Sequence, residues 1–277
     1  MRIAAAFSPM IDLDAYFGRI AYLGSREPTL ETLRALHWHH PLAIPFETLD
    51  PLLGRPVRLE LEVLERKLVA ERRGGYCFEQ NLLFGHALRA LGFAVTQLAG
   101  RVIWQAGDHE RRARTHMLLL VQLGEGAYVC DVGFGGLTLT APLRLEPDVE
   151  QQTPHEPFRV RREAREYSVE ARVGAEWSTL YRFDLQEQRQ VDIEVLNYYV
   201  STHPESPFLS RLMAARPTSD CRFALRDNVF SVYGGNGRLE QHELGSAAEL
   251  RGALALTFGI QLPADERLEA ALERVVA

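Results

Sequence analysis

The segment 73–81, which reads Arg-Gly-Gly-Tyr-Cys-Phe-Glu-Gln-Asn, constrains the fold more than any other part of the chain. Apolar side chains recur at helical spacing over residues 78–91, so a helix is expected to begin beside Cys77. Gly74 and Gly75 permit a tight backbone turn and the close approach of a ligand. The partial positive charge of a helix N-terminus favours the thiolate form of a cysteine. The segment therefore predicts a reactive thiol at the start of a helix.

Two later segments supply a base and a carboxylate that suit this thiol. His116 begins the apolar run 117–123, and Asp131 ends the run 127–131. The glycine-rich residues 124–126 predict a hairpin between the two runs, which sets the start of the first strand beside the end of the second. His116 is then within reach of Asp131, and the order cysteine, histidine, aspartate suits a thiol acyl-transfer triad.

Composition excludes several other classes of protein. A net charge of −6 argues against nucleic-acid binding, and no apolar run reaches the length of about 18 residues that a membrane-spanning helix needs. Residues 1–4 lack the apolar core of a secretion signal. The three cysteines, Cys77, Cys130 and Cys221, are too few and too scattered for a disulfide framework, and the last two are expected to be structural. These features predict a cytoplasmic protein.

The periodicity of the chain predicts an α+β fold. Residues 12–91 are mainly helical in pattern, and a strand pattern begins at Phe93 and continues to Phe183. A short helix is expected near 191–200, followed by a region of mixed strands and two terminal helices. With 277 residues the chain is long enough for one large domain or two to three small ones.

Each candidate residue also has a structural interpretation. A free cysteine is usually a small core residue, a histidine beside an apolar strand is often buried and satisfied, and an aspartate before glycine often caps a turn. Cysteine, histidine and aspartate are metal ligands too, and His37, His39 and His40 form a further cluster. The paired spacings typical of zinc sites are missing, so no metal site is expected. Residues 133–136 do not form a dinucleotide-binding fingerprint.

These residues together resemble the arylamine N-acetyltransferases. The resemblance rests first on the segment 73–81, on His116 and on Asp131-Val132-Gly133-Phe134-Gly135. It extends in order along nearly the whole chain, with further matches at 44–49, 100–102, 181–183 and 197–204. Thr48 departs from the pattern, because the family usually carries asparagine there, and this affects only local hydrogen bonding.

The resemblance implies a three-part architecture with a papain-like core. An N-terminal helical domain over residues 1–92 would carry the nucleophile. A central antiparallel β-barrel over 93–200 would carry the histidine and the aspartate. An α/β lid would follow over 201–277.

The resemblance also implies roles for individual residues. Cys77 would carry the acetyl group, with His116 as its base and Asp131 as the residue that orients His116. Gly135 falls where the chain of the family passes close to coenzyme A, and Glu47 and Arg73 match a structural ion pair. The apolar cleft for acceptor and cofactor would be lined by Phe46, Val102, Phe134 and Phe208.

The reaction implied is transfer of an acetyl group from acetyl-CoA to an arylamine or arylhydrazine, by a ping-pong mechanism through an acetyl-cysteine. Two other functions stay open. A papain- or transglutaminase-like cysteine hydrolase or amidase would use the same triad with water as the acceptor. A binding module without catalysis would keep the three groups as structural residues. The oligomeric state is also open, and a homodimer is one of the alternatives.

Overall fold

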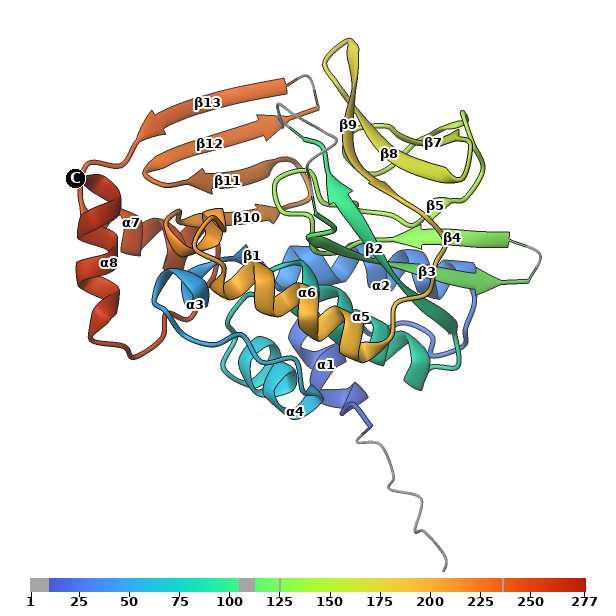
Figure 1. Ribbon diagram of the computed structural model, residues 1–277, viewed down its shortest axis with the longest axis horizontal. Coiled ribbons are helices and arrows are strands. Elements are labelled where there is room, and N and C mark those ends of the chain that lie inside the picture. Colours follow the sequence, from blue (N-terminus) through green and yellow to red (C-terminus); the bar gives the residue numbers. More distant parts are fainter. Residues whose placement is uncertain (1–9, 105–112, 125, 236) are drawn as a thin grey trace, which may run out of the picture.

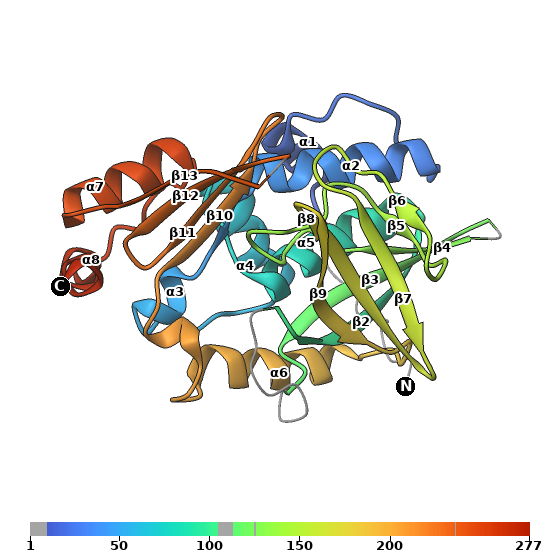
Figure 2. The same cartoon turned by 90° about the horizontal axis from the view of Figure 1, so that it is seen from above.

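The computed structural model describes residues 10–104, 113–124, 126–235 and 237–277. Residues 1–4, on which the expected lack of a secretion signal rests, and Glu125, in the expected turn at 124–126, lie outside the described residues. Figures 1 and 2 show two sheets side by side, with the helices of the N-terminal part packed beneath and between them. The α+β fold class predicted from periodicity is confirmed.

The N-terminal part is helical, and a polar side chain caps the start of each of its first two helices. Asp12 Oδ1 accepts a hydrogen bond from Ala15 N at the start of α1, and Thr29 Oγ1 accepts one from Thr32 N at the start of α2. Within the described residues, no helix has the length and apolar composition needed to cross a membrane. The helices are α1 (Leu13–Ile20), α2 (Leu30–Ala43), α3 (Leu49–Leu52), α4 (Leu61–Leu64) with the π-helical segment Glu65–Ala70, α5 (Cys77–Ala90) and, later, α6 (Gln190–Thr202).

The central part is an eight-stranded antiparallel sheet that curls into a nearly closed barrel, in the order β5-β4-β3-β2-β9-β8-β7-β6. The expected hairpin between β3 and β4 is confirmed, with Leu119 opposite Cys130. Continuing this register puts Asp131, the residue after β4, two residues along from His116 at the start of β3. The strands are β2 (Ala94–Val102), β3 (His116–Leu123), β4 (Gly126–Cys130), β5 (Leu143–Arg144), β6 (Glu150–Gln151), β7 (Phe158–Glu163), β8 (Glu166–Val173) and β9 (Glu176–Phe183).

The C-terminal part is a five-stranded sheet, and its first strand comes from the N-terminal part. The strand β1 pairs with β10, with Phe46 opposite Ala215, and Phe46 also bridges to Gly75, so the sheet extends to the turn that leads into Cys77. The sequence pattern did not predict this pairing, because a two-residue strand has no measurable period. The elements are β1 (Phe46–Glu47), β10 (Met213–Pro217), β11 (Arg222–Arg226), β12 (Val229–Gly234), β13 (Gly237–Glu243), α7 (Ala247–Gly252) and α8 (Arg267–Val276).

Three separate apolar clusters form the core of the molecule. The first lies between the helices and the outer faces of β3 and β4, the second beside the five-stranded sheet, and the third inside the barrel. Helix α6 crosses the predicted boundary at residue 200 and contributes Ile193 and Val200 to the helical cluster. The domain boundaries at 92 and 200 stay a prediction.

Candidate active site

Cys77 is the first residue of α5, and its position follows from a closely packed turn. The carboxylate of Glu79 accepts a hydrogen bond from the Tyr76 amide at 3.1 Å, which caps the helix. The turn needs glycine for lack of space, because a Cβ on Gly74 would lie 2.2 Å from the carbonyl oxygen of Pro45. A Cβ on Gly75 would lie 2.7 Å from Oε2 of Glu79. Cys77 itself is buried, with 5% of its surface exposed.

His116 and Asp131 form a buried pair beside this cysteine. His116 Nε2 lies 2.7 Å from Asp131 Oδ2, and both side chains are almost fully buried. Burial by itself would raise the pKa of Asp131, but the charge and hydrogen bond of His116 hold it below its ordinary value. Burial would likewise lower the pKa of His116, but the carboxylate of Asp131 raises it instead. The geometry thus favours an imidazolium–carboxylate pair.

The remaining ring nitrogen of His116 is left for the cysteine. Nε2 is engaged by Asp131, and a side-chain hydrogen bond with Cys77 is among the causes that raise the pKa of His116. Cys77 Sγ also lies 3.8 Å from the carbonyl oxygen of Thr115, directly before the histidine. The three residues predicted from the order cysteine, histidine, aspartate therefore meet, although α5 and the two strands are distant in sequence.

Asn81 joins the three elements and was not singled out from the sequence. Its Nδ2 donates to the carbonyl oxygen of Met117 at 2.8 Å and to Asp131 Oδ1 at 3.0 Å, while its Oδ1 accepts from Val132 N at 3.1 Å. One amide side chain thus ties α5 to β3 and to the residues after β4. The signal available in the sequence was the spacing of four residues from Cys77, which puts both side chains on one face of a helix.

Gly133 lies where the turn after β4 passes close to Cys77. A Cβ at this position would be 2.8 Å from Cys77 Cα and 3.0 Å from the Cβ of Gln80. Its amide donates to Asp131 Oδ1 at 3.0 Å, so the turn also orients the carboxylate. The close approach, and not a left-handed backbone, is what requires glycine here.

Aromatic side chains surround the histidine. The ring centroid of Phe134 lies 5.3 Å from that of His116 in an edge-on arrangement, and Tyr181 lies at 4.8 Å. Val102, at the end of β2, is the backbone partner of Tyr181 in β9. Two of the residues expected to line an apolar cleft therefore lie on this side, Phe134 by direct ring contact and Val102 through its strand neighbour.

The other residues expected at the cleft gather on the side of the nucleophile turn. The ring centroid of Phe208 lies 5.6 Å from that of Tyr76 and 6.3 Å from that of Phe46, and both contacts are edge-on. Gly135 adopts a φ of +95°, which favours glycine, and a Cβ there would lie 3.7 Å from the ring of Phe46. Phe46, Gly135 and Phe208 thus form one apolar group beside the turn that carries Cys77.

Two of the three histidines of α2, His37 and His40, are core residues with hydrogen-bond partners, and His39 is half-buried. His40 lies 2.7 Å from both the hydroxyl of Tyr16 and Oε1 of Gln80, and His37 Nε2 accepts from Asp131 N at 3.1 Å. Burial lowers the pKa of His37 to about 4 and that of His40 to about 3, so both stay neutral. Among the described residues, no group of three or more histidine, cysteine, aspartate or glutamate side chains is arranged to hold a metal ion.

The segment 46–48, which bridges to the turn at Gly75, is held from two directions. Arg73 donates to Glu47 Oε1 from Nη2 at 2.7 Å and from Nε at 3.0 Å, which confirms the expected ion pair. Thr48, where the sequence departs from the family pattern, donates to the carbonyl oxygen of Arg211 and accepts from Met213 N. The threonine hydroxyl thus connects α3 to the C-terminal sheet.

Comparison with known proteins identifies the family. A sequence model described as N-acetyltransferase matches residues 29–267. A relative from Mycolicibacterium smegmatis named arylamine N-acetyltransferase is 45% identical over 256 residues, which cover 91% of this chain and 93% of the relative. The chain belongs to the arylamine N-acetyltransferase family. An arylamine N-acetyltransferase from Escherichia coli is 42% identical over 249 residues, covering 90% and 88% of the two chains.

Solved structures of arylamine N-acetyltransferases share the fold. The structure of the Mycobacterium marinum enzyme in complex with CoA matches with a TM-score of 0.92 and 44% identity, covering 96% of this chain and all of that one. The Salmonella typhimurium enzyme matches with a TM-score of 0.89 and 39% identity, covering 97% and 99%. The resemblance read from the sequence is confirmed, and the protein is an enzyme of the acyltransferase class.

Proposed function

We propose that this arylamine N-acetyltransferase moves an acetyl group from acetyl-CoA to an arylamine or arylhydrazine by a ping-pong mechanism, with the acetyl group carried on Cys77. The observation that carries the proposal is the 2.7 Å contact between His116 Nε2 and Asp131 Oδ2, beside the cysteine that begins α5. The names of the relatives and the CoA complex of the M. marinum enzyme support the choice of acceptor and donor.

In the first half-reaction the Cys77 thiolate attacks the carbonyl carbon of acetyl-CoA. The carbon–sulfur bond to coenzyme A breaks as the new thioester forms, and the His116 imidazolium gives its proton to the departing thiolate. One thioester is exchanged for another, so the step is nearly isoenergetic. Asp131 keeps the imidazole in the correct tautomer and stabilises its charged form.

In the second half-reaction the amine attacks the acetyl-cysteine. An arylamine or arylhydrazine is weakly basic and largely unprotonated at neutral pH, so its lone pair is available. His116 accepts the proton that the amine loses, and the Cys77 thiolate leaves as the amide forms. The backbone amide at Cys77 is the candidate donor to the oxyanion of each tetrahedral intermediate.

The apolar residues on both sides of the triad are proposed to bind the substrates. Phe46, Val102, Phe134 and Phe208 would contact the aromatic acceptor and the cofactor, and the chain at Gly135 would pass close to coenzyme A. The ring contacts of Phe134 with His116 and of Phe208 with Tyr76 support this assignment. A reducing compartment such as the cytoplasm suits a catalytic thiol.

The decisive experiment is to incubate the protein with acetyl-CoA in the absence of an acceptor and to locate the acetyl group by peptide mass analysis. We expect one acetyl group on Cys77, which an arylamine then removes, and parallel initial-rate plots against acetyl-CoA at several amine concentrations. Rapid loss of the acetyl group to water would favour the cysteine hydrolase instead. Intersecting plots with no trapped acetyl-enzyme would exclude the proposal.

Alkylation provides an independent test of the thiol. We expect iodoacetamide at low pH to label Cys77 ahead of the other two cysteines. Cys130 is fully buried, and the described side-chain contact of Cys221 is with the hydroxyl of Thr218 and not with a histidine. Prior incubation with acetyl-CoA should protect Cys77, and an arylamine should restore labelling. Equal labelling of the three cysteines without protection would contradict the pairing of Cys77 with His116.

A further inference from the structure

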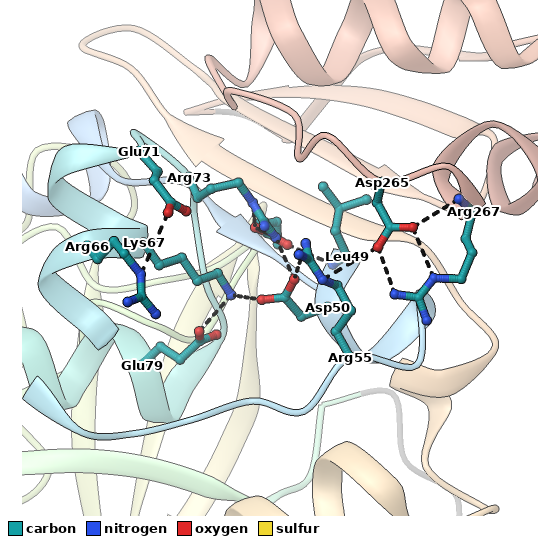
Figure 3. A network of polar contacts seen from close by, with 11 residues as sticks. Leu49, Asp50, Arg55, Arg66, Lys67, Glu71, Arg73, Glu79, Asp265 and Arg267 are labelled. Carbon is teal, nitrogen blue, oxygen red and sulfur yellow. Dashed lines mark hydrogen bonds and ion pairs between the residues drawn. The ribbon is translucent and has the colours of Figure 1, made fainter. Parts of the chain in front are cut away.

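A chain of charged side chains connects the turn before Cys77 with the C-terminal part of the protein. Figure 3 shows Lys67 between Asp50 and Glu79, with the contacts of Asp50 continuing through Arg55 to Asp265. Lys67 Nζ lies 2.6 Å from Asp50 Oδ2 and 2.6 Å from Glu79 Oε1. It is the only lysine in the chain, and it is buried. A buried ammonium needs compensating groups, and here two carboxylates supply them.

The two oxygens of Glu79 face in different directions and link this lysine to the nucleophile turn. Oε1 contacts Lys67, while Oε2 accepts the hydrogen bond of the Tyr76 amide, directly before Cys77. The same carboxylate packs against Gly75, where it leaves no space for a Cβ. The position of Glu79 therefore affects the backbone that leads into α5, and Lys67 is the cation that contacts it.

The charges around Glu79 make the lysine necessary. Three carboxylates meet in this buried cluster, those of Glu47, Asp50 and Glu79. The cations that face them are Lys67, Arg73 and, at 3.7 Å from Asp50, the partly exposed Arg55. Burial, with the charges of Asp50 and Glu47, raises the pKa of Glu79 to about 7, against the opposing effect of Lys67. Without the lysine, Glu79 would lose its cation and stay protonated to higher pH.

We propose that Lys67 is a positioning residue for the nucleophile, which holds the carboxylate of Glu79 against the Tyr76 amide and thereby sets the Cys77 thiol at the start of α5. Lys67 acts through Glu79 and does not touch the reacting atoms. The inference rests on the proposed role of Cys77 as acetyl carrier. It differs from a purely structural role, in which the buried pair would contribute to stability alone.

The first test replaces Lys67 with methionine, which has similar length and no charge. We expect Lys67→Met to slow the formation of acetyl-Cys77 about ten- to a hundredfold, the scale expected when a reacting group is displaced. The acid limb of the rate against pH should also move to higher pH, because Glu79 loses the cation that lowers its pKa. The readout is the single-turnover acetylation rate across pH, normalised to folded protein.

Arg66→Met is the matched control. Arg66 precedes Lys67 in the same π-helical segment, but its Nε lies 3.7 Å from Glu71 and both side chains are more than half exposed. This variant removes one positive charge from the same segment without touching the buried cluster. Its acetylation rate and pH profile should match those of the wild type. A loss equal to that of Lys67→Met would overturn the proposal.

A double variant tests whether Lys67 acts through Glu79. Glu79→Gln replaces one carboxylate oxygen with an amide nitrogen, so the side chain can no longer accept from both Lys67 and the Tyr76 amide, and acetylation should slow about as much as in Lys67→Met. In this background, adding Lys67→Met should cost little and should not move the acid limb. Losses that simply multiply would show independent effects and overturn the proposal.

The outcomes separate the two proposals. Absence of acetyl-Cys77 in the wild type overturns the proposed function, and this inference with it. A wild type that forms acetyl-Cys77, with a folded Lys67→Met that matches its rate and pH profile, overturns the role of Lys67 alone. If Lys67→Met does not fold, Lys67→Arg decides. It keeps the charge but displaces the point of contact, and a wild-type rate and profile in that variant would overturn the positioning role.

Discussion

At the scale of single residues, the candidate site depends on which partner each polar atom finds. Asp131 uses one oxygen for His116 and the other for Asn81 and the Gly133 amide. The sequence predicted the pair of histidine and aspartate because both residues flank the same hairpin. It did not predict Asn81, because the partners of an amide side chain depend on the registry of two strands against a helix.

The charge of Asp131 should matter more for the reaction than its hydrogen bonds to the turn. Asp131→Asn keeps the size of the side chain but removes the charge that stabilises the imidazolium of His116. We expect the acetylation rate to fall by about a hundredfold or more, as for other residues that orient a catalytic histidine. The measurement is the single-turnover rate with acetyl-CoA, with folding checked by circular dichroism. A near-normal rate would mean that Asp131 serves only to cap the turn at Gly133.

At the scale of elements, the site depends on the close approach of the turn after β4 to the start of α5. The apolar patterns predicted α5 and β4, and both contribute side chains to the same apolar cluster. The distance between them follows from tertiary packing, and Gly133 is the residue at the contact. Gly133 was named from the sequence, but this contact was not predicted.

A side chain at Gly133 should displace the nucleophile. In Gly133→Ala the new Cβ would lie 2.8 Å from Cys77 Cα, so we expect a loss of about 1–3 kcal/mol in the free energy of unfolding together with slower acetylation. Gly136→Ala is the control, because a Cβ there meets nothing within 4 Å, and its stability should change by less than about 0.5 kcal/mol. Urea denaturation measures both variants, and equal stabilities would contradict the packing described here.

At the scale of the whole molecule, buried polar contacts join parts that have separate apolar clusters. Arg222, at the start of β11, donates from Nε to Glu156 Oε2 at 3.1 Å, and its Nη2 lies 2.7 Å from Glu156 Oε1. Glu156 precedes the barrel strand β7, so this pair connects the barrel to the C-terminal sheet. The guanidinium is almost fully buried.

Removing Glu156 should leave a buried charge without its partner. We expect Glu156→Gln to reduce the free energy of unfolding by about 3 kcal/mol, since breaking a buried pair costs far more than breaking an exposed one. Glu163→Gln is the control, because Glu163 lies 3.8 Å from Arg182 at the surface and its loss should cost less than about 1 kcal/mol. Chemical denaturation compares the two, and similar losses would contradict a role for the pair in joining the parts.

The sequence by itself determined the fold class, the β3–β4 hairpin and the residues Cys77, His116 and Asp131, because periodicity and local motifs depend on near neighbours along the chain. Only the tertiary structure decided that β1 joins the C-terminal sheet, that Asn81 ties α5 to β3 and to the residues after β4, and that Lys67 lies between Asp50 and Glu79. These contacts join residues far apart in sequence, and burial makes a polar group depend on the partner that folding brings to it.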